Sequence, residues 1–363
     1  MKKENAFLLY PAASLLFSAY VLTHPLQCVF SISKALSICT NTLIPSLFPF
    51  VFAAKFTSCV LMPKKKSTAV TRLISLIFGI NENLAFSVIF GLFSGFPTGA
   101  VYVSEAYSKG LCTKKEAFRA ICLSNNCSAA FLISGAGIAV LGKASYGVLL
   151  IICQALSVIS AAQVLKLVYG NTYAKSSTRF DEKVEKPIIS RVFTESIKSS
   201  CLSMLYITGF MVFFYLCASI ITDSLSVFLP YNTHITNVLI GAALEVSTGT
   251  FACASLSFPL KVVFCAFCVC FPSLSVLFQV KSVCHEDFNI SGEYVFCHVC
   301  MALFSSLYAF LFLAFFGEPS TQSFQLFLML TAIAMAALGA IFGVKKITSA
   351  KRVKNVQKKC QNI

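Results

Sequence analysis

The stretch GLFSGFPTGAVYVSEAY, residues Gly91 to Tyr107, places three glycines and a proline between two apolar runs. A helix that simply crosses a bilayer has no use for such a break, because each unpaired backbone amide or carbonyl in hydrocarbon costs several kcal/mol. Broken helices persist where they are buried in protein or line a polar cavity. Ser94–Gly99 therefore predicts the tip of a re-entrant helical hairpin, with Pro97 in the first turn of the outgoing half-helix.

The rest of the chain has the composition of a membrane protein. Of its 363 residues 57% are hydrophobic and 12% are charged, with a mean hydropathy of +0.80, whereas soluble domains carry about 25% charged residues. Several apolar windows reach the ~20 residues that cross a bilayer as a helix. They are Ala6–Leu22, Thr42–Met62, Ala120–Val140, Ala144–Val168, Leu202–Thr222, Lys261–Val280, Tyr294–Phe316 and Phe324–Val344. We expect an all-α polytopic membrane protein with about eight transmembrane helices plus two re-entrant or broken helical hairpins.

The formal net charge of +15 is concentrated in short segments beside these windows. Lysine and arginine gather at Lys2-Lys3, Lys64–Arg72, Lys109–Arg119 and Lys345–Lys359. Basic residues next to apolar spans are orientation signals and interact favourably with anionic lipid. The pattern predicts a multi-pass protein of the cell membrane with both termini cytoplasmic, and it argues against a nucleic-acid partner.

The sequence also contains a weak internal repeat. Residues 43–56 resemble 204–217, 91–100 resemble 241–250, 125–132 fall over 272–279, and 154–160 fall over 301–307. Because the basic loops give matching segments opposite directions, we interpret this as an inverted repeat, the plan of many secondary transporters. The expected divisions are a transmembrane helix (1–24), a first repeat (25–168), a cytoplasmic linker (169–198), an inverted second repeat (199–316), a last transmembrane helix (317–344) and a basic cytoplasmic tail (345–363).

The repeat pairs the first break with Glu245–Gly249, which predicts a second hairpin tip. Matched breaks in two halves indicate a binding site, because half-helix ends offer partial charges to a ligand. A carboxylate inside a membrane usually faces a cavity, a partner or an ion, so Glu245 is a candidate proton or sodium site whose pKa burial would raise. Two alternatives remain open: glycine and proline also serve close helix packing, and Glu245 could lie solvated near the outer surface.

Further polar residues follow each tip in the next expected helices. Asparagine and glutamine both donate and accept hydrogen bonds, which suits a neutral polar solute, but they equally join helices to one another. The candidate substrate-binding residues are Ser94, Gly95, Pro97, Thr98, Gly99, Asn125, Asn126, Glu245, Ser247, Thr248, Gly249, Ser275 and Gln279.

Neither a cofactor, a metal site nor catalysis is predicted. Most of the 17 cysteines lie in apolar windows, where a thiol behaves as a small hydrophobe. The sequence has no HExxH motif, no Ser/His/Asp spacing and no phosphate-binding glycine loop, and its four histidines all lie near expected helix ends or loops.

Four segments resemble one known family. They are IPSLFPF (44–50), SGFPTGA (94–100), SEAYSKGLCTKKEA (104–117) and SNNCSAAFLISGAG (124–137). With them the chain resembles the nucleoside-recognition or Gate-domain membrane proteins, in particular the sporulation integral membrane proteins of that group. Those proteins have a Ser-Gly-Tyr-Pro-x-Gly-Ala turn, in which Phe96 stands here in place of the tyrosine. The resemblance also implies an Asn-rich turn after it, here Ser124-Asn125-Asn126. The resemblance implies a bacterial inner-membrane protein that acts in spore development and cortex formation.

Two functions are consistent with these features. The first is a transporter or gated permease for a small polar solute, in line with the resemblance a nucleoside-like one, with H⁺ or Na⁺ as coupling ion. The alternative is a non-transporting membrane scaffold or signalling partner in sporulation, which would dock partners on the linker and the basic tail. In either case the lipid bilayer is a partner, and a homo-oligomer is compatible with both.

Overall fold

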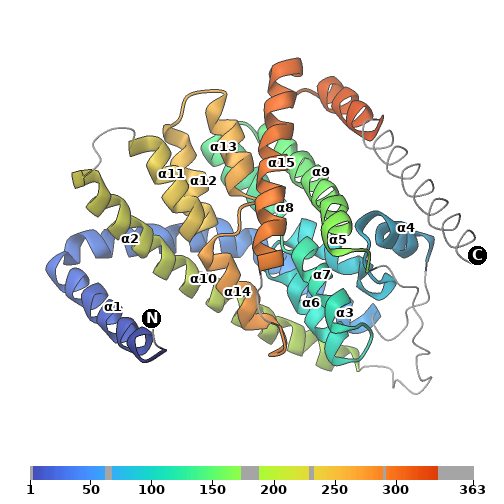
Figure 1. Ribbon diagram of the computed structural model, residues 1–363, viewed down its shortest axis with the longest axis horizontal. Coiled ribbons are helices and arrows are strands. Elements are labelled where there is room, and N and C mark those ends of the chain that lie inside the picture. Colours follow the sequence, from blue (N-terminus) through green and yellow to red (C-terminus); the bar gives the residue numbers. More distant parts are fainter. Residues whose placement is uncertain (1–2, 62–67, 173–187, 229–232, 289–291, 334–363) are drawn as a thin grey trace, which may run out of the picture. The chain divides into compact units, whose positions relative to one another are not determined.

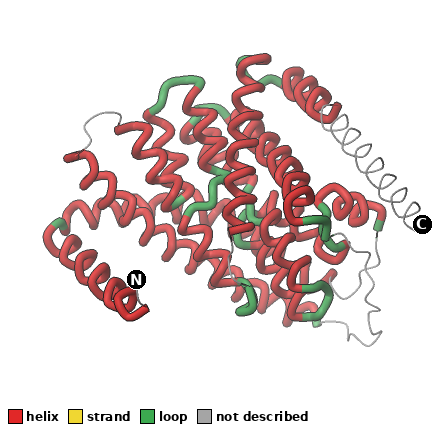
Figure 2. The backbone as a smooth tube through the Cα atoms, in the orientation of Figure 1, coloured by secondary structure: helices red, strands yellow, loops and turns green. Residues whose placement is uncertain are grey.

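The computed structural model describes residues 3–61, 68–172, 188–228, 233–288 and 292–333, and every element in these ranges is helical (Figures 1 and 2). The predicted all-α fold is therefore confirmed for the described part of the chain. The chain divides into two compact units, Met1–Leu311 and Phe312–Ile363.

The first unit contains most of the helices. In chain order they are α1 (Lys3–Thr23), α2 (Pro25–Ile38), η1 (Cys39–Leu43), α3 (Ile44–Leu61), α4 (Ala69–Phe78), η3 (Glu82–Leu84), α5 (Ala85–Ser94), α6 (Thr98–Ser108), α7 (Lys114–Ser124), α8 (Ala129–Phe131), η4 (Leu132–Val140), α9 (Ala144–Tyr169), α10 (Ile189–Phe228), α11 (Thr233–Leu244), α12 (Val246–Ala252), η5 (Cys253–Ser255), α13 (Leu260–Cys268), α14 (Leu274–Val283) and α15 (Gly292–Phe316), whose last turn belongs to the second unit.

In the second unit a helix from Thr321 to Ile333 packs on the last turn of α15. The ring of Phe312 lies 5.5 Å from that of Phe324 and 5.1 Å from that of Phe327. Residues 334–344 of the expected last span and the whole basic tail lie outside the described residues.

Four helical segments are long and apolar enough to cross a membrane: Lys114–Val140, Ala144–Tyr169, Ile189–Leu225 and Gly292–Phe316. The count rises to six if each of two bent helix pairs is one span, Pro11–Thr23 with Pro25–Leu43 and Ala69–Phe78 with Glu82–Ser94. These helices fit a membrane protein. The larger number of about eight spans, the inverted repeat and the direction of the termini stay predictions.

Two long helical stretches pack against each other, α10 on α2 and α3. The Lys55 ammonium on α3 donates to the backbone oxygen of Ser199 at 2.8 Å and to the hydroxyl of Ser203 at 2.9 Å, both on α10. The stretch made of α2 and α3 begins at Pro25, well before the start of the expected window at Thr42. Residues 189–198, which were expected in the linker, form the first turns of α10. Residues 173–187 of that linker lie outside the described part.

The first predicted break joins α5 to α6, and both helices pack on α7. Glycine is required there by close approach. A Cβ at Gly91 would lie 1.8 Å from the Ser124 backbone oxygen, and a Cβ at Gly99 would lie 2.2 Å from the same atom. At the turn itself Gly95 has φ +80°, which L residues with a side chain rarely adopt.

The second predicted break joins α11 to α12, which lie side by side (Figure 1). A Cβ at Gly241 would lie 2.7 Å from the Gly249 backbone nitrogen, so the two helices also touch through glycine. The break is shorter than predicted, since Glu245 alone separates the helices and Ser247, Thr248 and Gly249 belong to α12.

Two further breaks interrupt windows that the sequence suggested were continuous helices. Residues 125–128 separate α7 from α8, and residues 269–273 separate α13 from α14. Each following helix is capped by a serine: the Ser128 hydroxyl accepts from the Phe131 amide at 3.1 Å and the Ser273 hydroxyl from the Val276 amide at 3.3 Å. The placement of Asn125 and Asn126 in a helix was therefore wrong, because a local serine cap and pairing to neighbouring helices compensate the break.

Arg119 also departs from what the charge pattern of the sequence predicted. Its basic segment was interpreted as an orientation signal, but the side chain is only 1% exposed. Its guanidinium donates to Glu293 at the start of α15, 3.0 Å away, and to the Gly170 backbone oxygen after α9, 3.2 Å away. This partly buried ion pair and the bond to Gly170 thus join the middle of α7 to the start of α15 and the end of α9.

We expect Gly91→Ala to lower the thermal unfolding midpoint of the purified protein in detergent. The new methyl group would overlap a backbone oxygen, and overpacking of this kind costs about 1–3 kcal/mol. Gly209→Ala on α10 is the matched control, because a Cβ there meets nothing within 4 Å. An equal effect of the two substitutions on the midpoint would contradict the close approach of α5 to α7.

Candidate functional site

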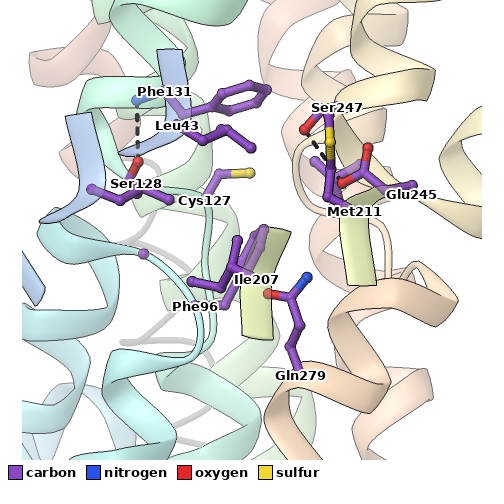
Figure 3. A pocket seen from close by; sticks show the side chains of 13 residues that line it. Leu43, Phe96, Cys127, Ser128, Phe131, Ile207, Met211, Glu245, Ser247 and Gln279 are labelled. Atoms are coloured by element: carbon purple, nitrogen blue, oxygen red, sulfur yellow. Dashed lines mark hydrogen bonds between the residues drawn. The ribbon is translucent and has the colours of Figure 1, made fainter. Parts of the chain in front are cut away.

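One cavity lies where both predicted hairpin tips meet (Figure 3). Its walls come from α3 and the turn before it, from α10, from the break at residues 125–128, from both tips and from α14. The lining residues are Leu43, Leu47, Gly95, Phe96, Cys127, Ser128, Phe131, Ile207, Met211, Glu245, Val246, Ser247 and Gln279.

The cavity is small in this conformation. The centre of a water molecule can occupy about 20 Å³ of it, and by the same measure one ordered water needs roughly 10–15 Å³. The space therefore accommodates one or two water molecules. An organic solute would fit only after the walls had moved apart.

Glu245 is the charged residue among the lining side chains, and it is only 3% exposed. It caps α12: one carboxylate oxygen accepts from the Thr248 amide at 2.8 Å and the Thr248 hydroxyl at 3.3 Å. The other oxygen accepts from the Ser247 hydroxyl at 3.3 Å. The alternative of a solvated glutamate does not fit this burial. Among the described residues, every ion pair joins other side chains.

Gln279 reaches the same cavity from α14. Its side-chain nitrogen donates to the Ser275 hydroxyl at 3.0 Å, while its side-chain oxygen is buried and has no hydrogen-bond partner. In Figure 3 its amide end points toward the space that Ile207 and Met211 border. The site thus combines a carboxylate with an amide oxygen that no protein donor satisfies.

The first tip is fixed to the break at residues 125–128. The Phe96 amide donates to the Asn126 backbone oxygen at 2.8 Å, and a Cβ at Gly95 would lie 2.7 Å from the Ser128 amide nitrogen. Gly95 and Phe96 line the cavity, whereas the Thr98 hydroxyl bonds to the Gly95 backbone oxygen and stabilises the turn.

The structure brings four of the candidate residues to the cavity: Gly95, Glu245, Ser247 and Gln279. The other candidates do not line it. They are Ser94, Pro97, Thr98, Gly99, Asn125, Asn126, Thr248, Gly249 and Ser275. Gly99 and Gly249 lie in close contact with the backbone of a neighbouring helix, which matches the alternative that these glycines serve close helix packing.

Asn125 and Asn126 lie next to the cavity wall and are 2% and 3% exposed. Their side-chain nitrogens donate to the backbone oxygens of Ile121 at 2.6 Å and Leu123 at 3.0 Å, at the end of α7. Their side-chain oxygens are buried without a partner. They terminate α7, and the next two residues, Cys127 and Ser128, line the cavity instead.

Gln154 supports this wall and was missed by sequence reasoning. From the middle of α9 its side-chain oxygen accepts from the Cys127 amide at 3.1 Å and its nitrogen donates to the Cys127 backbone oxygen at 3.0 Å. One amide thereby satisfies both backbone groups of a non-helical residue. The available signal was a glutamine at the centre of a long apolar window.

His298 is a comparable case at the break before α14. The sequence placed it near a helix end, but it is only 3% exposed inside α15 and is hydrogen-bonded to the backbone of Cys270. Its other ring nitrogen is buried without a partner. Within the described ranges no three His, Cys, Asp or Glu side chains form a metal-binding group.

Comparisons with protein-family models, with curated proteins and with solved structures gave no match for this chain. The geometry of the cavity and the resemblance of the sequence segments are therefore the grounds for a functional proposal.

We expect Gln154→Ala to destabilise the protein. The substitution leaves the amide and the carbonyl of Cys127 unpaired in a buried environment, and each such loss costs about 1–3 kcal/mol. Thermal unfolding in detergent would measure the effect, with Gln322→Ala as control because Gln322 is exposed. A midpoint as high as that of the control variant would show that the break does not depend on this amide.

Proposed function

We propose that the protein is a transporter or gated permease for a small polar solute. One observation carries the proposal: two chain breaks far apart in the sequence, at Gly95-Phe96 and at Glu245–Ser247, line one small cavity together with Gln279. A buried carboxylate and an unpaired amide oxygen are unfavourable in an apolar bundle without a ligand or water. Groups of this kind inside a membrane usually belong to a substrate or ion pathway.

The order of the helices supports the inverted repeat on which such a mechanism depends. The long helix α2–α3 corresponds to α10, and the hairpin α5–α6 corresponds to α11–α12. The broken helix α7–α8 then corresponds to α13–α14, and the straight helix α9 to α15. Ser128 and Ser273 cap equivalent helices in this alignment. In transporters built this way, the substrate site lies between the halves near the middle of the bilayer.

The small cavity corresponds, in this proposal, to a contracted state between two open ones. It has space for one or two water molecules, so solute binding requires a hairpin tip to move away from α10 and α14. The sequence resemblance supports a nucleoside-like solute and a role in endospore formation in a bacterial cell membrane.

Uptake into proteoliposomes that contain the purified protein tests this function. We expect saturable uptake of at least one solute from a panel of labelled nucleosides and other small metabolites. Glu245→Gln and Gln279→Leu should each reduce it at least about tenfold, the effect of losing roughly 1.4 kcal/mol of binding. Glu105→Gln is the matched control, because the Glu105 side chain is 37% exposed and pairs with Lys109.

The opposite outcome is equally informative. Folded protein that supports no flux of any solute contradicts transport. If those cavity variants also supported normal spore formation while deletion of residues 173–187 abolished it, a scaffold role would replace the transporter.

A further inference from the structure

Glu245 places a carboxyl group in a region where no described residue offers it a positive partner. Among the described residues its neighbours are hydrogen-bond donors from Ser247 and Thr248, and no lysine, arginine or histidine forms an ion pair with it. Hydrogen bonds alone rarely compensate a fully buried carboxylate, which needs a counter-charge or a proton. The folded protein must therefore neutralise Glu245 from outside the chain.

Gln279 supplies a second oxygen at the same cavity that could contact a positively charged ligand. Gln279 is 2% exposed and lines the cavity. Its side-chain oxygen is buried and accepts no hydrogen bond. The Ser247 hydroxyl directs its hydrogen to Glu245, so its lone pairs remain available as an acceptor. Three oxygen-bearing side chains thus line one small cavity with acceptor atoms, an arrangement that attracts a positively charged occupant.

The size of the space limits what that occupant is. About 20 Å³ is open to the centre of a water molecule, enough for one or two waters or a dehydrated alkali cation and too little for an organic cation. A single carboxylate also matches a single positive charge. Calcium takes six to eight oxygen ligands, and magnesium requires a regular octahedron and retains several waters, neither of which this cavity provides.

We propose that Glu245, Ser247 and Gln279 form a binding site for one dehydrated monovalent metal cation, with sodium as the probe. This inference rests on the proposed function in one respect only: the bound cation would be the coupling ion. Occupancy would join the tip of α11–α12 to α14, because Glu245 and Ser247 come from the tip and Gln279 from α14. The apolar walls, such as Ile207 and Met211, would strengthen the attraction by excluding water.

Thermal unfolding of the purified full-length protein tests the site without requiring transport. Sodium chloride is exchanged for choline chloride at constant ionic strength and constant pH. A ligand that binds only the folded state raises the midpoint with its concentration, so we expect a saturable rise of roughly 3 °C or more in sodium. Glu245→Gln and Gln279→Leu should abolish the rise, whereas Glu105→Gln should retain it.

The substitutions are judged only if they fold. Each variant must elute as a single species in gel filtration and unfold cooperatively in choline. If Glu245→Gln fails this criterion, two other measurements test the site: the sodium response of Gln279→Leu and the direct binding of radioactive sodium to the wild-type protein. A wild-type midpoint indifferent to sodium, or a sodium-dependent rise that persists in both cavity variants, overturns the proposal.

A proton is the competing counter-charge, and the same measurement separates it. Other titratable groups that interact with Glu245 are the thiols of Cys39 and Cys127. Three results together would show that protonation neutralises the carboxylate, and would refute the metal site. Acidification in choline chloride raises the unfolding midpoint, Glu245→Gln removes that rise, and sodium does not change the midpoint. A sodium effect without flux of any solute would instead retain the site and refute transport.

Discussion

The constraint behind this structure is that a helix broken inside an apolar bundle must find partners for every backbone group that the break exposes. Water is excluded there, and each unpaired amide or carbonyl costs several kcal/mol. The chain meets this requirement with side chains from other helices. Gln154 on α9 pairs with both backbone groups of Cys127, and His298 on α15 bonds to the backbone of Cys270. These contacts tie the straight helices to the broken ones.

The same constraint explains why the cavity exists where it does. The half-helices α8, α14 and α12 begin at N-terminal caps, Ser128, Ser273 and Glu245, whose side chains each accept from an amide of the first turn. Close glycine contacts then bring the capped ends together, as at Gly95 against Ser128. What remains at the meeting point is a small space with acceptor oxygens left over. The site is thus a consequence of how the breaks are stabilised.

Sequence alone revealed the first hairpin tip because glycine and proline mark it directly, and the weak internal repeat then pointed to the second tip. It also placed Gly95, Glu245, Ser247 and Gln279 among the candidates, and these four line the cavity. The apolar windows gave no sign of the breaks at residues 125–128 and 269–273, because apolar residues surround them and their partners lie on distant helices. For the first break, the family resemblance alone implied an Asn-rich turn. Arg119 was missed for a similar reason: its partner Glu293 is far away in the sequence, and a basic residue beside a span normally signals orientation.

The two tips are held in different ways, and this asymmetry bears on the proposed mechanism. The first tip bonds outward, from the Phe96 amide to the Asn126 backbone oxygen, and its glycines leave no space against Ser124. The second tip bonds within its own hairpin, since Glu245 pairs with Ser247, Thr248 and, through its amide, the Gly241 backbone oxygen. Moving the first tip would break a buried backbone hydrogen bond, whereas the bonds described for Glu245 travel with the second tip. If the cavity opens for a solute, the α11–α12 tip is therefore the element that moves, and a cation held between Glu245 and Gln279 would be what keeps it closed.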